Sequence, residues 1–326
     1  METAFTQELI DRARGCIMGA FIGDASGAPL EFAKTINQQT IDSAIKMQGG
    51  GVFGMTPGQI TDDGELSMCV LQGLANCKDG YNPDLICVEY GRWYNSSPFD
   101  IGNTTKNALK HAAPMKSNMS AQITKAALNM AYSVSNGSTM KLSPTAVYCS
   151  FLKDADQVKR LVETETRHMH SNQNVIDCNI AFALAIRDLI RGEPADKAYQ
   201  TMREFAIKSS ISKWVEELER KELQPVHLMI GWVKIAFQQS FLHLAMKTPF
   251  ATAIREIISQ GGDSDTNACI AGMLLGARDG YSKLPQESID AVLKCDTKRI
   301  PRPEFLRPGL YFEKNFNQMI ENCKKL

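Results

Sequence analysis

The sequence predicts an all-α protein, a single domain of packed helices over residues 1–326. Apolar residues recur at positions i, i+3, i+4 and i+7 through most of the chain, which is the period of an amphipathic helix. No segment shows the alternating pattern of a half-buried strand, and there is no β-α-β rhythm. No low-complexity linker divides the chain, so we expect one domain despite its length.

Three stretches rich in Gly, Ser, Asn and Pro interrupt the helical pattern, at residues 31–61, 95–102 and 133–145. Loops of this kind often carry functional residues on a rigid scaffold. The segment 180–186 is apolar on nearly every side, so its helix is expected at the centre of the bundle. The predicted helices cover residues 5–22, 63–77, 83–94, 103–112, 121–132, 154–167, 173–192, 195–209, 227–246, 249–260, 265–279 and 312–325.

The composition argues against several protein classes. The chain has 36 basic and 36 acidic side chains, a balance that disfavours nucleic acid as the main partner. No apolar run reaches the length of a membrane span, and the N-terminal residues lack the pattern of a secretion signal. The nine cysteines are scattered and never spaced C-x-x-C, so neither a zinc site nor a disulfide framework is expected. We therefore expect a cytoplasmic protein without membrane or nucleic-acid partners.

Two helices carry small residues at every fourth position, which places those residues on one helical face. A glycine inside a helix costs about 0.5–1 kcal/mol relative to alanine, so a repeated stripe needs a reason. Close approach of another backbone is one reason, and it would bring the flanking acidic segments together. Coincidence, with helix ends at Gly23–Gly27 and at Gly280, is the alternative. The two stripes are Gly15, Gly19, Gly23 and Gly27, and Ala268, Gly272, Gly276 and Gly280.

Two acidic segments, 61–63 (Thr-Asp-Asp) and 262–266 (Gly-Asp-Ser-Asp-Thr), each open a predicted helix. Helix capping explains one acid per helix but explains adjacent or alternating acids poorly. Hard oxygen ligands of this kind suit Mg²⁺ or Mn²⁺ better than zinc. If the two segments meet, they hold enough carboxylate for two divalent cations about 3.5–4 Å apart. Caps on solvated turns remain the alternative interpretation.

With these segments in view, the sequence resembles the ADP-ribosylglycohydrolase family, which contains dinitrogenase-reductase-activating glycohydrolase and the ADP-ribosylarginine hydrolases. The resemblance spans about residues 11–281, in the order of the family's motifs. Ser264, Ser135 and Lys141 depart conservatively from the family pattern. The matching blocks are 23–32 (GDASGAPLEF), 57–63 (PGQITDD), 100–105 (DIGNTT), 135–141 (SNGSTMK) and 261–268 (GGDSDTNA).

The resemblance implies an all-α orthogonal helical bundle of the ADP-ribosylglycohydrolase type, with two Mg²⁺ or Mn²⁺ ions at the base of a cleft. Glu31 would lie on a loop that closes over the cleft. Carried over by position, the metal ligands would be Thr61, Asp62, Asp63, Asp263, Asp265 and Thr266. The residues facing ADP-ribose would be Gly102, Asn103, Thr104, Ser135, Asn136, Gly137, Ser138, Met140 and His170.

Chemistry supports part of this assignment. Gly137 allows close backbone approach, and consecutive amides can form an anion-binding nest for a diphosphate, although a plain Asn-Gly turn is the alternative. His170 precedes the central helix where the family often carries a Thr-His pair, but Met169 replaces the threonine, and His168 is a weaker match. The catalytic candidates are Glu31, Asp62 and Asp263. Either Glu31 or Asp263 would assist proton transfer, and the sequence does not choose between them.

The expected activity is therefore metal-dependent removal of mono-ADP-ribose from modified proteins, with free ADP-ribose as product. Family analogy favours an arginine linkage. The alternatives are hydrolysis of serine-linked, poly- or O-acetyl-ADP-ribose, a non-catalytic ADP-ribose-binding relative, and a purely structural relative similar to a lens crystallin.

Overall fold

The computed structural model describes residues 5–113 and 118–326, and this part of the chain folds into α-helices joined by loops, with no β-strand. Within these two described ranges, short 3₁₀ turns extend four of the connections. The helices are α1 (Gln7–Gly27), α2 (Gln38–Ile45), α3 (Asp62–Asn76), α4 (Pro83–Asn95), α5 (Asn103–Leu109), α6 (Met119–Ala127), α7 (Ser143–Cys149), α8 (Ala155–Arg167), α9 (Gln173–Ile190), α10 (Ala195–Ala206), α11 (Ser212–Glu219), α12 (Val233–Ala245), α13 (Phe250–Ser259), α14 (Ser264–Asp279), α15 (Gln286–Leu293) and α16 (Pro308–Cys323).

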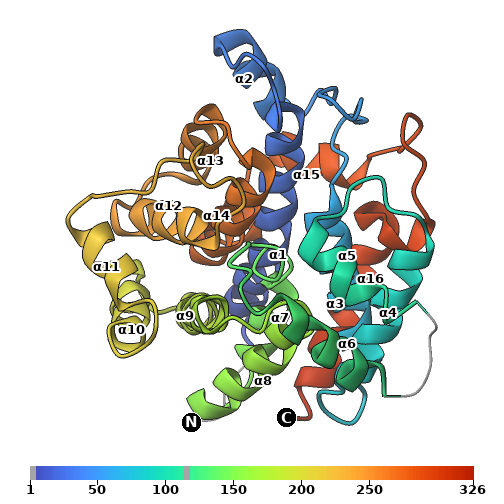
Figure 1. The fold of residues 1–326 in the computed structure, drawn as a ribbon, viewed down its shortest axis with the longest axis vertical. Coiled ribbons are helices and arrows are strands. Elements are labelled where there is room, and N and C mark those ends of the chain that lie inside the picture. The colour runs from blue at the N-terminus through green and yellow to red at the C-terminus, as the bar shows by residue number, and fades with distance from the viewer. Residues whose placement is uncertain (1–4, 114–117) are drawn as a thin grey trace.

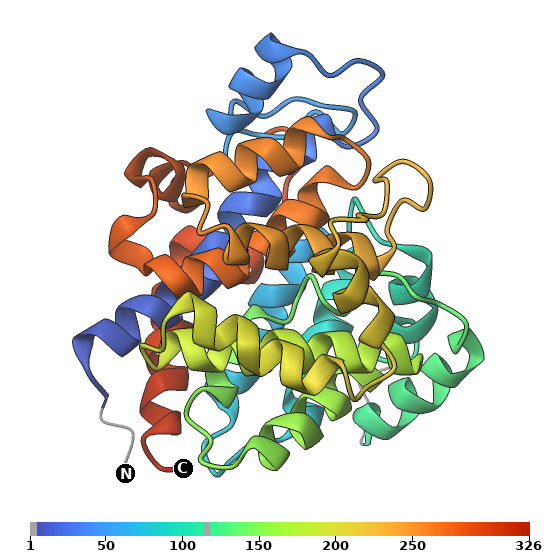
Figure 2. The same ribbon diagram turned by 90° about the vertical axis from the view of Figure 1, so that its left-hand side faces the viewer.

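The long first helix, α1, runs through the middle of the molecule (Figure 1). Helices α9 to α14 lie on one side of it, and α3 to α6 with α16 lie on the other. Helix α2 projects at the end opposite the C-terminus in both views (Figures 1 and 2). Every residue of the segment 180–186 in α9 is buried, as predicted for a central helix.

Helices α1 and α14 pack with their backbones in direct contact, and the glycine stripes form that contact. A Cβ atom on Gly19 would lie 2.3 Å from the carbonyl oxygen of Gly272, and one on Gly23 would lie 2.0 Å from that of Ala268. These distances are far inside van der Waals contact, so no larger residue fits. Helix α1 ends at Gly27 and Gly280 caps α14, as the alternative expected, but these close contacts show that the stripes are not a coincidence.

Several predicted boundaries and loops were wrong. The stretches at 31–61 and 133–145 were expected to be irregular, but they contain α2 and the start of α7. Helices α11 and α15 were also missed; both are only eight residues long, too short for a clear period. The helix predicted over 227–246 begins at Val233, because Gly231 has a positive φ of 80° and the preceding residues form a loop.

None of the helices described is both long and apolar enough to cross a bilayer. The expectation that the first residues lack a secretion signal falls largely on residues 1–4, which lie outside the described part of the chain.

We predict that Gly272→Ala destabilises the protein by about 2 kcal/mol or more, because its Cβ would lie 2.1 Å from the carbonyl oxygen of Gly19 and would force the helices apart. Urea unfolding measures the change. Gly102→Ala is the control, since no atom lies within 4 Å of its Cβ position and its φ is negative. Equal stability of Gly272→Ala and wild type would contradict this account of the packing.

Candidate active site

A cavity of about 400 Å³ opens where the starts of α3, α5 and α14 meet the loop at 135–140. Six carboxylates line it, and no lysine or arginine is among the described residues around it. This charge pattern suits a cation far better than a bare anion. The lining residues are Glu31, Phe32, Asp62, Asp63, Asp100, Ile101, Gly102, Asn103, Thr104, Thr105, Ser135, Asn136, Gly137, Met140, Ile230, Gly231, Asp263, Asp265 and Thr266.

The two acidic segments converge although about two hundred residues separate them. The Thr266 hydroxyl at the start of α14 donates to Asp63 Oδ1 at the start of α3, over 3.3 Å. The carboxylates of both acidic segments therefore lie beside helix N-termini, where the helix dipole favours negative charge. The predicted meeting of the two segments is confirmed.

Asp24 of α1 fixes the start of α3 against the central helix pair. Its buried carboxylate accepts hydrogen bonds from the Thr61 amide (3.0 Å), the Thr61 hydroxyl (2.9 Å) and the Gly64 amide (2.9 Å). A Cβ on Gly64 would lie 2.8 Å from Asp24 Oδ2, so the glycine admits this approach. Burial raises the pKa of Asp24 to about 7, although these hydrogen bonds oppose the rise. Through these contacts, the packing of α1 on α14 also sets the position of Asp62 and Asp63.

The carboxylates in the cavity lack enough protein partners. Asp63 Oδ2 and Glu31 Oε2 are buried and accept no hydrogen bond. Burial, followed by the repulsion of neighbouring carboxylates, raises the pKa values of Asp62, Asp63 and Asp265 well above their usual range. The same two causes raise the pKa of Glu31 to about 8. Clustered buried acids of this kind require protons or cations to offset their repulsion.

Two overlapping groups of carboxylates have the geometry to hold a metal ion. One is Asp24, Asp63 and Asp265, and the other is Glu31, Asp100 and Asp265; within each group, ligand oxygens lie within 4.8 Å of one another. Unpartnered buried oxygens and an all-oxygen donor set match the preference of Mg²⁺, Mn²⁺ and Ca²⁺. The residues present therefore fit a divalent cation.

The loop at 135–140 forms a second wall of the cavity. The Asn136 amide nitrogen Nδ2 donates to Asp263 Oδ2 over 2.7 Å, which ties this loop to the acidic segment of α14. The backbone N–H of Asn136 donates to the Gly231 carbonyl (2.9 Å), and an isolated bridge pairs Ser135 with Trp232. The loop is thus held between α14 and the segment before α12.

A buried ion pair anchors the C-terminal end of the same loop. Lys141 directly follows the cavity-lining Met140, and its Nζ donates to Glu165 Oε1 of α8 over 2.6 Å. Both side chains are almost fully buried. Burial alone would raise the pKa of Glu165, but the adjacent Lys141 ammonium and His168 hold that pKa well below its usual range. Glu165 is therefore a fixed negative charge facing Lys141.

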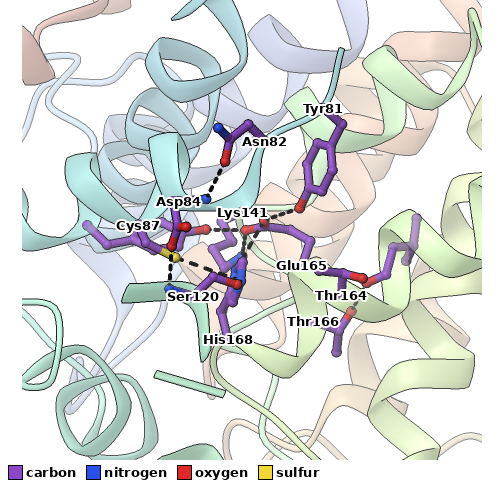
Figure 3. Close-up of polar contacts among 12 residues, drawn as sticks. Tyr81, Asn82, Asp84, Cys87, Ser120, Lys141, Thr164, Glu165, Thr166 and His168 are labelled. Carbon is purple, nitrogen blue, oxygen red and sulfur yellow. Dashed lines mark hydrogen bonds and ion pairs between the residues drawn. The ribbon is translucent and has the colours of Figure 1, made fainter. Parts of the chain in front are cut away.

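Further donors surround Glu165 (Figure 3). The Tyr90 hydroxyl donates to Oε1 and the Tyr81 hydroxyl to Oε2 (3.1 Å), while His168 Nδ1 lies 3.3 Å from Oε2. His168 Nε2 in turn lies 2.9 Å from the Ser120 hydroxyl of α6. This network connects α4, α6 and α8 behind the loop and does not enter the cavity.

Comparison with known proteins agrees with this geometry. The ADP-ribosylglycohydrolase family profile matches residues 6–310. The chain belongs to the ADP-ribosylglycohydrolase family. Proteins of this family are hydrolases that act on ADP-ribosyl glycosidic bonds, so the chain is an enzyme of this class.

Named relatives span most of the chain. A protein of Acanthamoeba polyphaga mimivirus whose name assigns it to the ADP-ribosyl glycohydrolases is 30% identical over 92% of this chain and 96% of its own length. The ADP-ribosyl-[dinitrogen reductase] glycohydrolase of Rhodospirillum rubrum is 29% identical over 84% and 88%. An ADP-ribosylarginine hydrolase of Serratia proteamaculans is 25% identical over 88% and 76%.

A solved structure titled ADP-ribosylglycohydrolase-related protein complex shares the fold. It superposes with a TM-score of 0.73 at 21% identity and covers 98% of this chain and 99% of its own. This likeness confirms the predicted all-α family fold.

Three of the residues predicted from the family motifs do not line the cavity. Thr61 caps α3, and its hydroxyl is used by Asp24 and the Asp63 amide. The Ser138 hydroxyl accepts from Asn179, one layer behind the wall. His170 is fully buried and contacts the Ser135 hydroxyl through Nε2 (2.8 Å), so it supports a lining residue from behind.

Several residues that line the cavity were not predicted from the sequence. Asp100 is the first residue of the matched 100–105 block but was given no role, although an acid at the start of a predicted site loop was an available signal. Ile230 and Gly231 were placed inside a predicted helix, where their part in the cavity could not be foreseen. Phe32 follows Glu31 with a φ of 56°, a sparsely populated region for a bulky residue that no sequence pattern indicated.

We predict that Lys141→Met destabilises the protein by about 3–5 kcal/mol, because it leaves the Glu165 charge buried without its cation. Urea unfolding at neutral pH measures the effect. The control, Lys159→Met, removes an exposed pair with Asp156 and should change stability by less than about 1 kcal/mol. Similar effects of the two substitutions would refute the anchoring role.

Proposed function

We propose that this chain is a metal-dependent hydrolase that releases mono-ADP-ribose from arginine side chains of modified proteins. The observation that carries the proposal is the convergence of six carboxylates on one cavity, with no lysine or arginine lining it in the part of the chain that the structure describes. Family membership supports the ADP-ribosyl bond as the target, and a relative named as an ADP-ribosylarginine hydrolase favours the arginine linkage.

We assign the metal site to Asp62, Asp63, Asp263, Asp265 and Thr266. Two Mg²⁺ or Mn²⁺ ions are proposed, because two groups of carboxylates have cation-binding geometry, and Asp63 and Asp265 belong to these groups. The assignment of Asp62, Asp263 and Thr266 rests on the family motifs and on their place in the cavity lining. We also propose Thr61 as a ligand, because its hydroxyl donates its proton to Asp24 and the same oxygen keeps lone pairs for a cation. When bound, divalent ions polarise ribose hydroxyls and lower the pKa of a coordinated water.

The protein's own residues would hold the substrate and move the proton. Backbone amides around Gly137 are proposed to bind the diphosphate, because the loop borders the cavity and a glycine has no side chain to cover them. Carboxylates beside the anomeric carbon would stabilise an oxocarbenium-like transition state. Glu31 or Asp263 would transfer the proton; both line the cavity.

Two other functions differ in what they require of the cavity. A non-catalytic ADP-ribose-binding protein would not need so many buried carboxylates, whose mutual repulsion destabilises the fold. Hydrolysis of serine-linked, poly- or O-acetyl-ADP-ribose would use the same carboxylates, and only the linkage would differ. Substrates that differ in linkage alone therefore separate these activities.

We predict that Asp62→Asn and Asp265→Asn each lower turnover of ADP-ribosylarginine at least about a hundredfold, while the fold stays intact. Release of free ADP-ribose is measured with and without EDTA, with serine-linked substrate in parallel. Asp156→Asn, at an exposed carboxylate, is the control and should keep full activity. Full, EDTA-insensitive activity in a folded Asp62→Asn variant would overturn the metal assignment.

We also predict that Mg²⁺ or Mn²⁺ raises the melting temperature of the wild-type protein. An ion that binds only the folded state stabilises that state by about 2.7 kcal/mol when the free ion concentration is a hundred times Kd. Asp62→Asn should reduce this increase. In EDTA the same variant should melt no lower than wild type, because the substitution removes one of the repelling charges around Asp63. A lower melting temperature in EDTA would show that Asp62 stabilises the fold without a metal.

A further inference from the structure

The loop before α12 exposes three consecutive large apolar side chains. Leu228 is 64% exposed, Met229 46% and Ile230 58%. Runs of this kind are rare on folded surfaces unless they bind something. Elsewhere in the described chain, exposed apolar residues such as Met246 and Leu310 stand alone in the sequence.

This loop is fixed at both ends of the apolar run. Before it, Val226 is buried, and its carbonyl oxygen would lie 2.8 Å from a Cβ on Gly262, so the two backbones touch. After it, the Gly231 carbonyl accepts from the Asn136 amide (2.9 Å) at the cavity wall. The three side chains are therefore presented on a loop that is attached to the active site.

A second apolar group borders the same opening. Phe32 is 58% exposed and Val52 60% exposed. The Phe32 ring packs edge-on against Phe53 at 6.3 Å, and Phe53 packs against Phe99 at 5.7 Å. Phe32 and Ile230 both line the cavity, so both apolar groups lie at its edge. We call Phe32, Val52, Phe53, Leu228, Met229 and Ile230 the apolar rim.

The apolar rim does not match the chemistry of the cavity inside it. The polar side chains that line the cavity carry carboxylates, hydroxyls and amides, which suit metal ions, ribose and phosphate. If the proposed function holds, the ADP-ribosyl group enters this cavity while still covalently attached to a protein. That protein must then lie against the cavity opening, where the exposed apolar side chains are.

We propose that the apolar rim binds apolar side chains of the modified protein that flank the ADP-ribosylated residue. This inference rests on the proposed function and specifies what the enzyme recognises beyond the ADP-ribosyl group. The rim thus selects sites whose neighbouring residues are hydrophobic, because burying them at the rim removes apolar surface from water. Small substrates such as free ADP-ribosylarginine have no neighbouring residues, so the apolar rim does not increase their binding.

The experiment compares three substrates: free ADP-ribosylarginine, and two peptides of equal length with one ADP-ribosylated arginine flanked by either leucines or serines. Wild-type enzyme should show a kcat/KM about tenfold higher on the leucine peptide, which corresponds to about 1.4 kcal/mol. The variant Leu228→Ser/Met229→Ser, and separately Val52→Ser, should reduce this preference. Both should retain wild-type activity on free ADP-ribosylarginine, because none of these three residues lines the cavity.

The control variant is Met246→Ser/Leu310→Ser, which removes two equally exposed apolar side chains away from the rim and should keep the preference. Hydrolysis of ADP-ribosylarginine with no peptide preference in wild type, or a preference that survives in both rim variants, overturns the rim proposal alone. Absence of hydrolysis on every arginine-linked substrate overturns the proposed function, and the rim proposal with it.

Discussion

The backbone contact between α1 and α14 is the constraint from which the site follows. Side chains larger than hydrogen are excluded from positions 15, 19, 272 and 276, so the two helices meet at a fixed depth and register. At the C-terminal end of α1, a Cβ on Gly27 would lie 2.4 Å from the Cα of Asp265. The same contact therefore places the acidic start of α14 directly beside Asp24.

From that point the position of the remaining carboxylates depends on hydrogen bonds. Asp24 holds the Thr61 and Gly64 amides, and so the first turn of α3. Asn136 holds Asp263 from the opposite wall. Without a counter-ion this arrangement of carboxylates destabilises the fold. The buried like charges repel one another, and the rest of the fold prevents them from separating. The same carboxylate oxygens therefore affect both the stability of the fold and the proposed chemistry. A cation bound there for catalysis would also reduce the repulsion between these carboxylates.

The sequence predicted the structure well where a residue pattern repeated, or where two acidic motifs together could form one metal site. The four-residue glycine spacing predicted the α1–α14 contact, and paired acids predicted the meeting of the two segments. It was uninformative about short helices such as α11 and about Gly231, whose positive φ keeps the preceding residues in a loop, so that α12 begins at Val233 and not at position 227 as the apolar period indicated. Such features depend on tertiary contacts, here between Gly231 and Asn136, that leave no local trace.

The family motifs marked the neighbourhood of the site more reliably than the role of each residue. Ser138 and His170 lie in matched or adjacent segments, but their side chains face Asn179 and Ser135 instead of the cavity. A motif position can be retained because it supports a lining residue. Only the direction of the side chain separates the two roles, and that direction follows from packing on α9 and on the neighbouring loop.

The central claim is that carboxylates from both ends of the chain share divalent cations. Diffraction from crystals grown with Mn²⁺ and ADP-ribose, recorded at a wavelength where manganese scatters anomalously, tests it directly. The account predicts anomalous peaks about 2.0–2.3 Å from oxygens of both Asp62 or Asp63 and Asp263 or Asp265. Peaks confined to one segment, or ADP-ribose bound in the cavity without any anomalous signal there, would contradict it.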